Sequence, residues 1–193
     1  MRLLFHRHLL TSMVVWLTAL FWSAQLTAQV GKLRLPPIPE DSRFIQDHAM
    51  LLDNDTRVRI EELQRVAYAD HQTPIVVVTI HSQAKCSGAG MPIEEFAQKW
   101  FDHWGLGVRD QQGLLINKAI LILISVQDRK ARIELGADWG RRWDNHCDKI
   151  MQSRMVPQFK NGNYDQGTLD GVAALAAMAA EGPTANPPKA LST

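Results

Sequence analysis

The chain has 193 residues, of which 46% are hydrophobic, and its 21 Lys and Arg against 20 Asp and Glu give a formal net charge of +1. A near-neutral chain without a basic stripe gives no electrostatic reason to expect nucleic acid as a partner. The length is enough for one domain with a sizeable core.

The first 28 residues predict a secretory signal peptide. Residues 1–8 contain Arg2 and Arg7 and no acid. An apolar run then extends from Leu9 to Trp22, and small and polar residues follow up to Ala28. This order is typical of a signal peptide that is cleaved after its small residues. The alternative is an uncleaved membrane anchor, although the run is shorter than the ~20 residues of a spanning helix. Either way we expect export, to the periplasm if the protein is bacterial, with membrane contact only through an uncleaved N-terminal segment.

Two proline-containing segments flank the predicted domain. Residues 29–43 form a leader with three prolines between positions 36 and 39, and residues 182–193 form a polar end. Such composition favours extended or flexible chain. We therefore expect the folded domain to occupy residues 44–181.

Helices and strands alternate through this domain. A helix is predicted over 53–70, because Asp53 can cap its first N–H groups and apolar residues repeat at helical spacing from Ile60 to Ala67. The β-branched run at 75–80 predicts a central strand that is covered on both faces.

The next predicted helix spans 92–104, with Pro92 at its first turn and Gly105 after its end. Its apolar face is rich in aromatic residues, and it consists of Ile93, Phe96, Ala97, Trp100, Phe101 and Trp104. An aromatic face could stack a ligand, but its helical spacing favours packing in the core.

A buried strand at 119–126, a tight turn and a second strand at 131–136 follow, and helices are predicted over 143–159 and 165–181. The turn and the second strand are dense in charge. The order of these elements predicts an α/β fold, a three-layer α/β/α sandwich around a small mixed β-sheet.

The two cysteines, Cys86 and Cys147, both lie in the part that we expect to be exported. In an oxidising compartment two thiols often pair, so a disulfide between them could form. Sequence does not give the distance between their α-carbons, and the pairing stays open.

Several short segments occur in a distinctive order. They lie at 44–49, 75–79, 104–107 (Trp-Gly-Leu-Gly), 128–136 (Asp-Arg-Lys-Ala-Arg-Ile-Glu-Leu-Gly), 156–159 and 162–167 (Gly-Asn-Tyr-Asp-Gln-Gly). Together they resemble the TPM domain family, which includes exported bacterial proteins and thylakoid-lumen phosphatase-like proteins. The glycine-rich turn that follows Gly136 in many members is replaced here by 137–143, so the ligand of this chain could differ.

The resemblance implies a divalent cation, calcium above all. Calcium binds hard oxygen ligands, and the acids at the edges of the predicted elements that could supply them are Asp47, Glu134, Asp138 and Asp144. Of these, Asp47 and Asp144 match the acidic positions of the family best. We expect the four acids to converge at one end of the sheet. Each also has a structural alternative, in which Asp47 and Asp144 cap turns or helices and Glu134 pairs with an arginine.

Two functions follow from the resemblance. The first is a cation-binding module that serves in the assembly, maintenance or quality control of envelope proteins. The second is a metal-dependent acid phosphatase that hydrolyses phosphomonoesters, although no phosphate-binding glycine loop or nucleophile motif is present. Residues that could contact an anion or a partner are Arg129, Arg132, Arg141, Arg142, Trp139 and Trp143. For the first function we expect the two tryptophans to be exposed.

Overall fold

The structure is a computed structural model, and it describes residues 32–39, 44–109, 112–113 and 115–188. The predicted signal peptide lies outside these residues. The folded unit begins at Arg34. Among the described helices none is long and apolar enough to cross a membrane.

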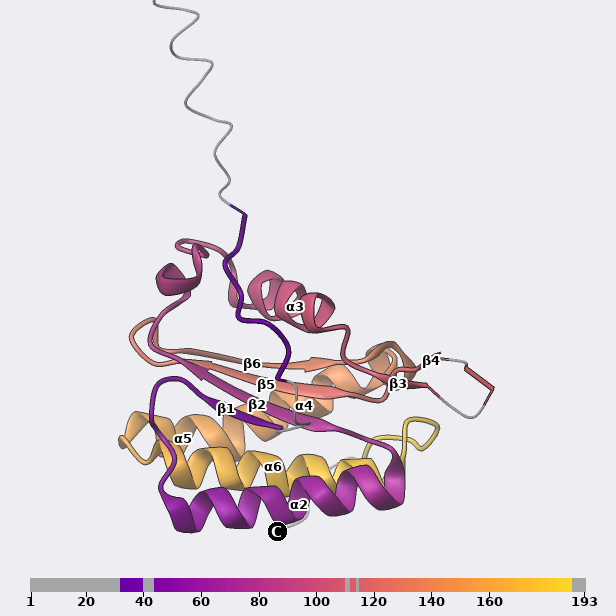
Figure 1. The fold of residues 1–193 in the computed structure, drawn as a ribbon. Coiled ribbons are helices and arrows are strands. Elements are labelled where there is room, and N and C mark those ends of the chain that lie inside the picture. The colour runs from indigo at the N-terminus through magenta and orange to yellow at the C-terminus, as the bar shows by residue number, and fades with distance from the viewer. Residues whose placement is uncertain (1–31, 40–43, 110–111, 114, 189–193) are drawn as a thin grey trace, which may run out of the picture. The chain divides into compact units, whose positions relative to one another are not determined.

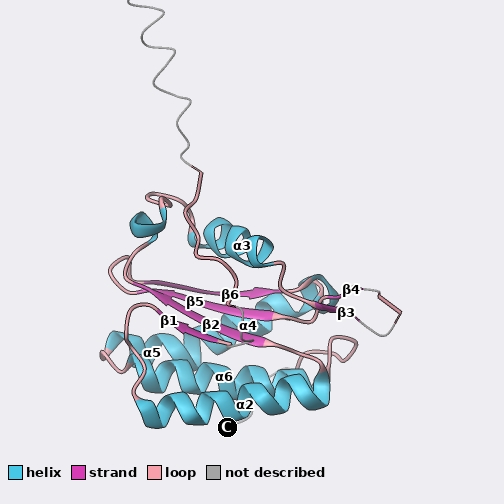
Figure 2. Cartoon of the chain, viewed as in Figure 1, coloured by secondary structure: helices cyan, strands magenta, loops and turns pink. Residues whose placement is uncertain are grey.

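A four-stranded mixed sheet forms the centre of this unit (Figures 1 and 2). Its order is β1 (Ile45–Asp47), β2 (Ile75–Ile80), β5 (Ile120–Ser125) and β6 (Lys130–Leu135). The first three strands are parallel, and β6 pairs with β5 in the antiparallel sense. Every residue of β2 and β5 is buried, as their continuous apolar runs predict.

The sequence patterns missed three short strands. One is β1, and the others are β3 (Val108–Arg109) and β4 (Leu115–Ile116), which form a separate antiparallel pair. Strands of two or three residues are too short to show an alternation of polar and apolar side chains.

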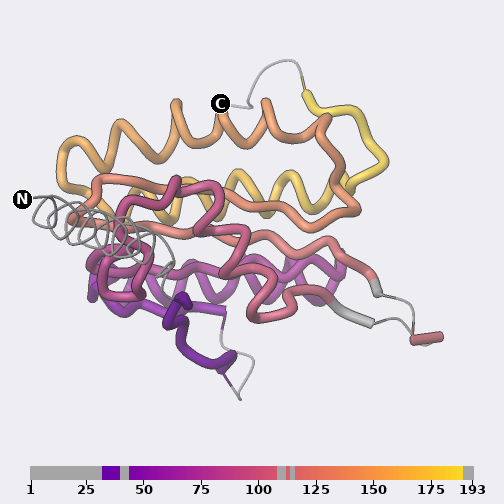
Figure 3. The backbone as a smooth tube through the Cα atoms, turned by 90° about the horizontal axis from the view of Figure 1, so that it is seen from above, coloured from indigo at the N-terminus to yellow at the C-terminus, as the bar shows by residue number. Residues whose placement is uncertain are grey.

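Helices cover both faces of the sheet, which confirms the three-layer α/β/α sandwich (Figure 1). The helix α3 (Ile93–Trp104) covers one face, and α2 (Asn54–His71) and α6 (Tyr164–Glu181) cover the other. Seen from above, α6 lies between α2 and the segment of α4 and α5 (Figure 3). All six residues of the apolar face of α3 are buried, so its aromatic side chains belong to the core.

The helix predicted over 143–159 is divided into three parts. A regular helix, α4 (Asp144–Ile150), continues into a π-helical turn (Met151–Met155) and then into α5 (Val156–Lys160). Pro157 has no N–H group, so it cannot donate the α-helical hydrogen bond to the carbonyl of residue 153. The missing bond gives a physical reason for the irregular turn before it.

Parts of both flanking segments are fixed to the domain, which differs from the expected flexibility. In the leader, the indole Nε1 of Trp104 donates to the carbonyl of Pro36 at 2.8 Å, and Arg34 N donates to the carbonyl of Cys86 at 3.0 Å. After α6, Trp143 Nε1 donates to the carbonyl of Pro183 at 3.2 Å. Composition missed these contacts because their partners, Cys86 and two tryptophans, come from distant elements.

Candidate functional site

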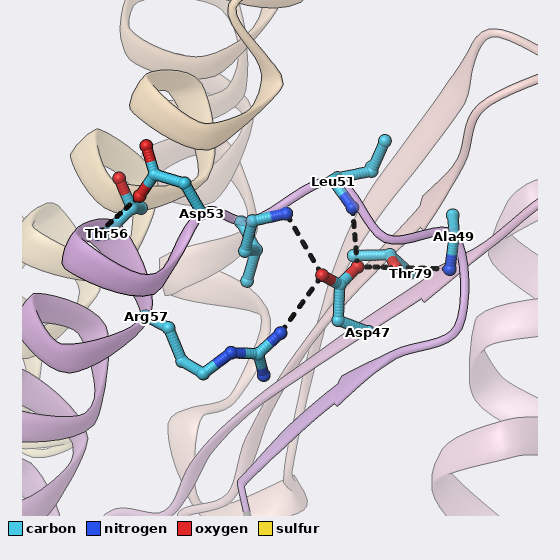
Figure 4. A network of polar contacts seen from close by, with 8 residues as sticks. Asp47, Ala49, Leu51, Asp53, Thr56, Arg57 and Thr79 are labelled. Atoms are coloured by element: carbon cyan, nitrogen blue, oxygen red, sulfur yellow. Dashed lines mark hydrogen bonds and ion pairs between the residues drawn. The ribbon is translucent and has the colours of Figure 1, made fainter.

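Asp47 ends β1 and is surrounded by hydrogen-bond donors (Figure 4). Its Oδ1 accepts from Leu51 N at 3.0 Å and from the hydroxyl of Thr79, and its Oδ2 accepts from Leu52 N at 3.0 Å and Arg57 Nη2 at 3.2 Å. The side chain is only 2% exposed. Two donors on each oxygen occupy the lone-pair directions that a metal ion would need.

The four acids predicted to converge are not brought together. Asp47 lies at the carboxyl end of β1, beside the end of β2. Asp138 lies at the opposite end of the sheet, because it contacts Asn117, which precedes β5. The expectation of one site that includes Asp47 is therefore wrong. The physical reason is that Asp47 fixes the loop between β1 and α2, a local task that its position in the sequence does not reveal.

Asn117 and Asp138 form a compact turn at the amino end of β5. Asn117 N donates to Asp138 Oδ2 at 3.0 Å, and Asp138 N donates to the carbonyl of Asn117 at 3.2 Å. Gly136 stands beside them, where a Cβ would collide with the Asn117 carbonyl. The side-chain Oδ1 of Asn117 is buried and has no hydrogen-bond partner among the described residues. A buried oxygen without a partner is uncommon and calls for a water, an ion or a ligand.

The carboxyl group of Glu134 lies near one acid from each of two other elements, Asp144 and Asp102. Burial raises the pKa of Glu134 above its usual range, the guanidinium of Arg132 opposes this shift, and Asp144 and Asp102 add to it. Arg132 Nε lies 3.2 Å from Glu134 Oε2, the ion pair that the structural alternative expected. Glu134 and Asp144 are thus within electrostatic range of each other. Asp102, on α3, was not singled out in the sequence because it lies 32 residues away from Glu134.

The predicted aromatic and basic surface needs a correction. Trp139 and Trp143 are fully buried, and their rings pack edge to face at 5.4 Å. Trp139 Nε1 donates to the carbonyl of Lys118 at 2.9 Å. Arg141 and Arg142 are exposed on the short turn between the two rings. The tryptophans are core residues because their three-residue turns fold them onto the sheet.

The cysteines are both free and buried. Burial raises the pKa of the Cys147 thiol to about 12 and also raises the pKa of Cys86. Both groups are therefore protonated thiols at neutral pH, which are poor nucleophiles and poor metal ligands. In the part of the chain that the structure describes, no group of three or more His, Cys, Asp or Glu could hold a metal ion.

Comparisons with known proteins give the family and the fold. Residues 45–178 match the TPM domain family, whose model carries the label TPM phosphatase. The N-terminal domain of a protein from P. gingivalis has a similar structure, with 27% identity and a TM-score of 0.60. The match covers 77% of this chain and 88% of that domain. No curated protein matches the chain.

Two further solved structures share the fold. The N-terminal domain of a protein from Corynebacterium glutamicum has 13% identity and a TM-score of 0.54, and it covers 84% of this chain and 99% of its own. The BA42 protein from Bizionia argentinensis has 20% identity and a TM-score of 0.53, and it covers 72% of this chain and 86% of its own. At these identities the likeness shows the fold alone. The family match covers more than half of the chain, and the protein belongs to the TPM domain family.

Proposed function

We propose that the domain binds a divalent cation, calcium in particular, where Asn117 and Asp138 meet at the amino end of β5. The observation that carries this proposal is the buried, unpartnered Oδ1 of Asn117, a residue whose backbone N–H donates to the carboxylate of Asp138. Both groups offer hard oxygen atoms, which suit calcium and not the softer transition metals. Glu134, four residues before Asp138, and Asp144, six residues after it, add negative charge to this end of the domain.

The affinity expected from these donors is low. They include few carboxylates, so water and backbone carbonyls would complete the coordination of the ion. Calcium sites of extracellular modules with few charged ligands have Kd values of about 10⁻⁴ to 10⁻³ M. Calcium at that level is available outside the cytoplasm, which agrees with the predicted export.

Calcium titration followed by NMR tests the site. We expect saturable shifts in the backbone amides of Asn117 and Asp138, and we expect Asp138→Asn to abolish them. Asp148→Asn, which removes an exposed acid from α4, is the matched control and should bind as the wild type does. Shifts that are equal in both variants would mean non-specific attraction to acids, and the proposal would fail.

The predicted signal peptide supports a function in the cell envelope. There we propose that the domain acts in the assembly, maintenance or quality control of envelope proteins, with the cation as a structural element. Mass spectrometry of the protein recovered from cells tests the first step. A mature chain that begins at Gln29 supports export with cleavage, whereas a chain that keeps its first 28 residues in the cytoplasmic fraction contradicts it.

A metal-dependent acid phosphatase is the second candidate. Arg141 and Arg142 favour it, because they are exposed close to Asp138 in the sequence and form no ion pair among the described residues. Guanidinium groups there could bind the oxygens of a phosphomonoester, and a bound cation would supply an activated water. Hydrolysis of p-nitrophenyl phosphate that requires calcium and is lost in Arg141→Ala would support this activity. Hydrolysis that is absent or independent of calcium would leave cation binding alone.

A further inference from the structure

A pocket of about 560 Å³ lies at the other end of the sheet, where the β5–β6 hairpin meets the turn between α5 and α6. We call it the basic pocket. Its cationic residues are Arg129, Lys130 and Lys160, and no Asp or Glu lines it. The volume is in the range of small-molecule sites. Three positive charges around one cavity would strongly favour an anion.

Among the described residues none of the three cations forms a salt bridge. The nearest acid in the sequence, Asp128, is already engaged, since its Oδ2 accepts from Ser125 Oγ at 2.6 Å and from Gln83 N at 2.7 Å. These hydrogen bonds lower the pKa of Asp128, the charge of Lys130 adds to this shift, and the two bonds hold the carboxylate toward the loop after β2. Asp128 therefore offsets part of the charge of Lys130, and the charges of Arg129 and Lys160 are available to a ligand.

The hairpin turn that carries two of these cations has an unusual backbone. Arg129 adopts a left-handed conformation with φ of 52°, and its N–H donates to the carbonyl of Val126 at 3.0 Å. A residue with a long side chain rarely adopts this conformation, which costs about 1 kcal/mol or more. Such strain is more common at binding sites than elsewhere.

The remaining wall of the pocket is apolar and aromatic. Phe159 and Tyr164 stack with their centroids 5.3 Å apart and their planes at 24°. Gly167 makes room for this pair, because a Cβ at that position would lie 2.6 Å from Phe159 Cε1. The segment at 162–167 thus has a specific task, in which Gly162 turns the chain with φ of 82°, Tyr164 stacks and Gly167 accepts the ring.

From this combination we infer that the basic pocket binds a small amphipathic anion, an oxyanion group on a flat apolar body. The oxyanion would contact Arg129, Lys130 and Lys160, and the body would lie against Phe159 and Val156. Guanidinium and ammonium groups form strong charge-assisted hydrogen bonds with phosphate and carboxylate alike. The inference does not depend on the proposed cation site, which lies at the opposite end of the sheet.

Titration of the purified protein with phenylphosphonate, followed by NMR, tests the inference, because its carbon–phosphorus bond excludes hydrolysis as a readout. We expect saturable shifts in the turn at 126–130 and in 159–164. Inorganic phosphate, which lacks the apolar body, should bind at least about tenfold more weakly, a difference of about 1.4 kcal/mol. A parallel titration with benzoate tells which oxyanion, phosphonate or carboxylate, the pocket prefers.

Substitutions locate the binding. Arg129→Ala and Lys160→Ala should each weaken phenylphosphonate binding about tenfold, whereas Arg59→Ala, which removes an exposed cation from α2, should leave it unchanged. Phe159→Leu should weaken phenylphosphonate but not inorganic phosphate. Urea unfolding of each variant shows that it is folded.

Three outcomes would overturn the inference. They are equal losses in Arg59→Ala and Arg129→Ala, equal binding of phosphate and phenylphosphonate, and binding of neither phenylphosphonate nor benzoate. Asp138→Asn serves as a second control, because it should abolish calcium binding without affecting phenylphosphonate.

Discussion

The carboxylate of Asp47 accepts hydrogen bonds from two backbone N–H groups, a hydroxyl and a guanidinium, and these come from three segments of the chain. Thr79 joins the arrangement twice, since its Oγ1 also accepts from Ala49 N at 3.1 Å. An acid with this set of partners stabilises a loop, and the hydrogen-bond acceptor sites of its carboxylate are all occupied. A carboxylate such as Asp138, with fewer partners, is better placed to bind an ion.

Replacement of Asp47 by Ala should therefore destabilise the fold. Leu51 N, Leu52 N and the Thr79 hydroxyl would lose their acceptor in a site that is almost fully buried, and Arg57 would lose its ion-pair partner. The expected loss in the free energy of unfolding is about 3 kcal/mol. Urea denaturation measures it, and Asp70→Ala, which removes an exposed acid from α2, should change stability by less than about 0.5 kcal/mol. Equal stability of Asp47→Ala and the wild type would contradict a structural role.

Glu134 gives the domain a dependence on pH. Its pKa is raised in the folded state, mainly by burial, so between its unfolded and folded pKa values the native state binds more protons than the unfolded chain. The free energy of unfolding then decreases as the pH rises through this window. Its favourable contribution is complete below the unfolded pKa and is lost above the folded one.

Glu134→Gln removes this titration. Relative to the wild type, the variant should gain stability as the pH rises from about 4 to about 7, since the wild type must ionise a partly buried carboxyl and Gln does not. Urea denaturation at several pH values measures the difference, with Glu61→Gln, an exposed position on α2, as the control. A difference between Glu134→Gln and wild type that is constant with pH would contradict the prediction.

At the scale of elements, the π-helical turn and α5 pack closely on α6, at two glycines of α6 that lie one helical turn apart. Phe159 meets Gly167, and Met155 meets Gly171, where a Cβ would lie 2.6 Å from the Met155 sulfur. The side chains, four residues apart, and the glycines, four residues apart, face each other across the two helices. The π-helical turn ends at Met155, directly before α5. The close packing of Met155 and Phe159 on the two glycines explains why α6 contains glycines, although glycine weakens a helix.

Gly167→Ala tests this packing. Alanine favours a helix over glycine by about 1 kcal/mol, but its Cβ would collide with the ring of Phe159. We expect a net loss of about 1 to 2 kcal/mol, because overpacking costs more than the helix gains. In a Phe159→Ala background the collision with the ring is absent and only the contact with Gln158 Cβ at 3.0 Å remains, so the same substitution should cost much less or stabilise. Denaturation of the four proteins gives the coupling, and a loss of equal size in both backgrounds would mean that the ring does not set the requirement for glycine.

For the folded unit as a whole, the segment after α6 completes the core. Trp143 is fully buried, its indole donates to Pro183, and Ala185 packs against the hydrophobic cluster. Composition alone assigned residues 182–193 to a flexible tail. The described part, up to Pro188, instead contacts Trp143 and the hydrophobic cluster.

A chain that ends at Glu181 should accordingly be less stable than one that ends at Pro188. Removal of 182–188 leaves the indole N–H of Trp143 without its acceptor and exposes apolar surface, for an expected loss of about 1 to 3 kcal/mol. Urea denaturation and a red shift of tryptophan fluorescence in the native state measure the effect. The chain ending at Pro188 is the control, and identical unfolding curves of the two chains would contradict a structural role of the segment.

Much of the architecture follows from local pattern. The buried strands β2 and β5, the helices α2, α3 and α6, and the mixed α/β sandwich were predicted within a few residues, because apolar periodicity records which face of each element is covered. Motifs spread from 44 to 167 also identified the family, as the match over 45–178 confirms. These features depend on neighbours along the chain, which the sequence shows directly.

The chemistry of individual side chains was decided by the tertiary structure. Asp47 and Asp138 are both acids at element ends, yet Thr79, 32 residues away from Asp47, helps to saturate the first, while the second accepts from the backbone N–H of Asn117. Trp139 and Trp143 look like a surface in sequence and are core in the fold. Sequence determined the elements because their pattern is local. Only the fold determined which carboxylates, cations and indoles have partners, because those partners come from distant segments, and burial and electrostatics depend on what meets in space.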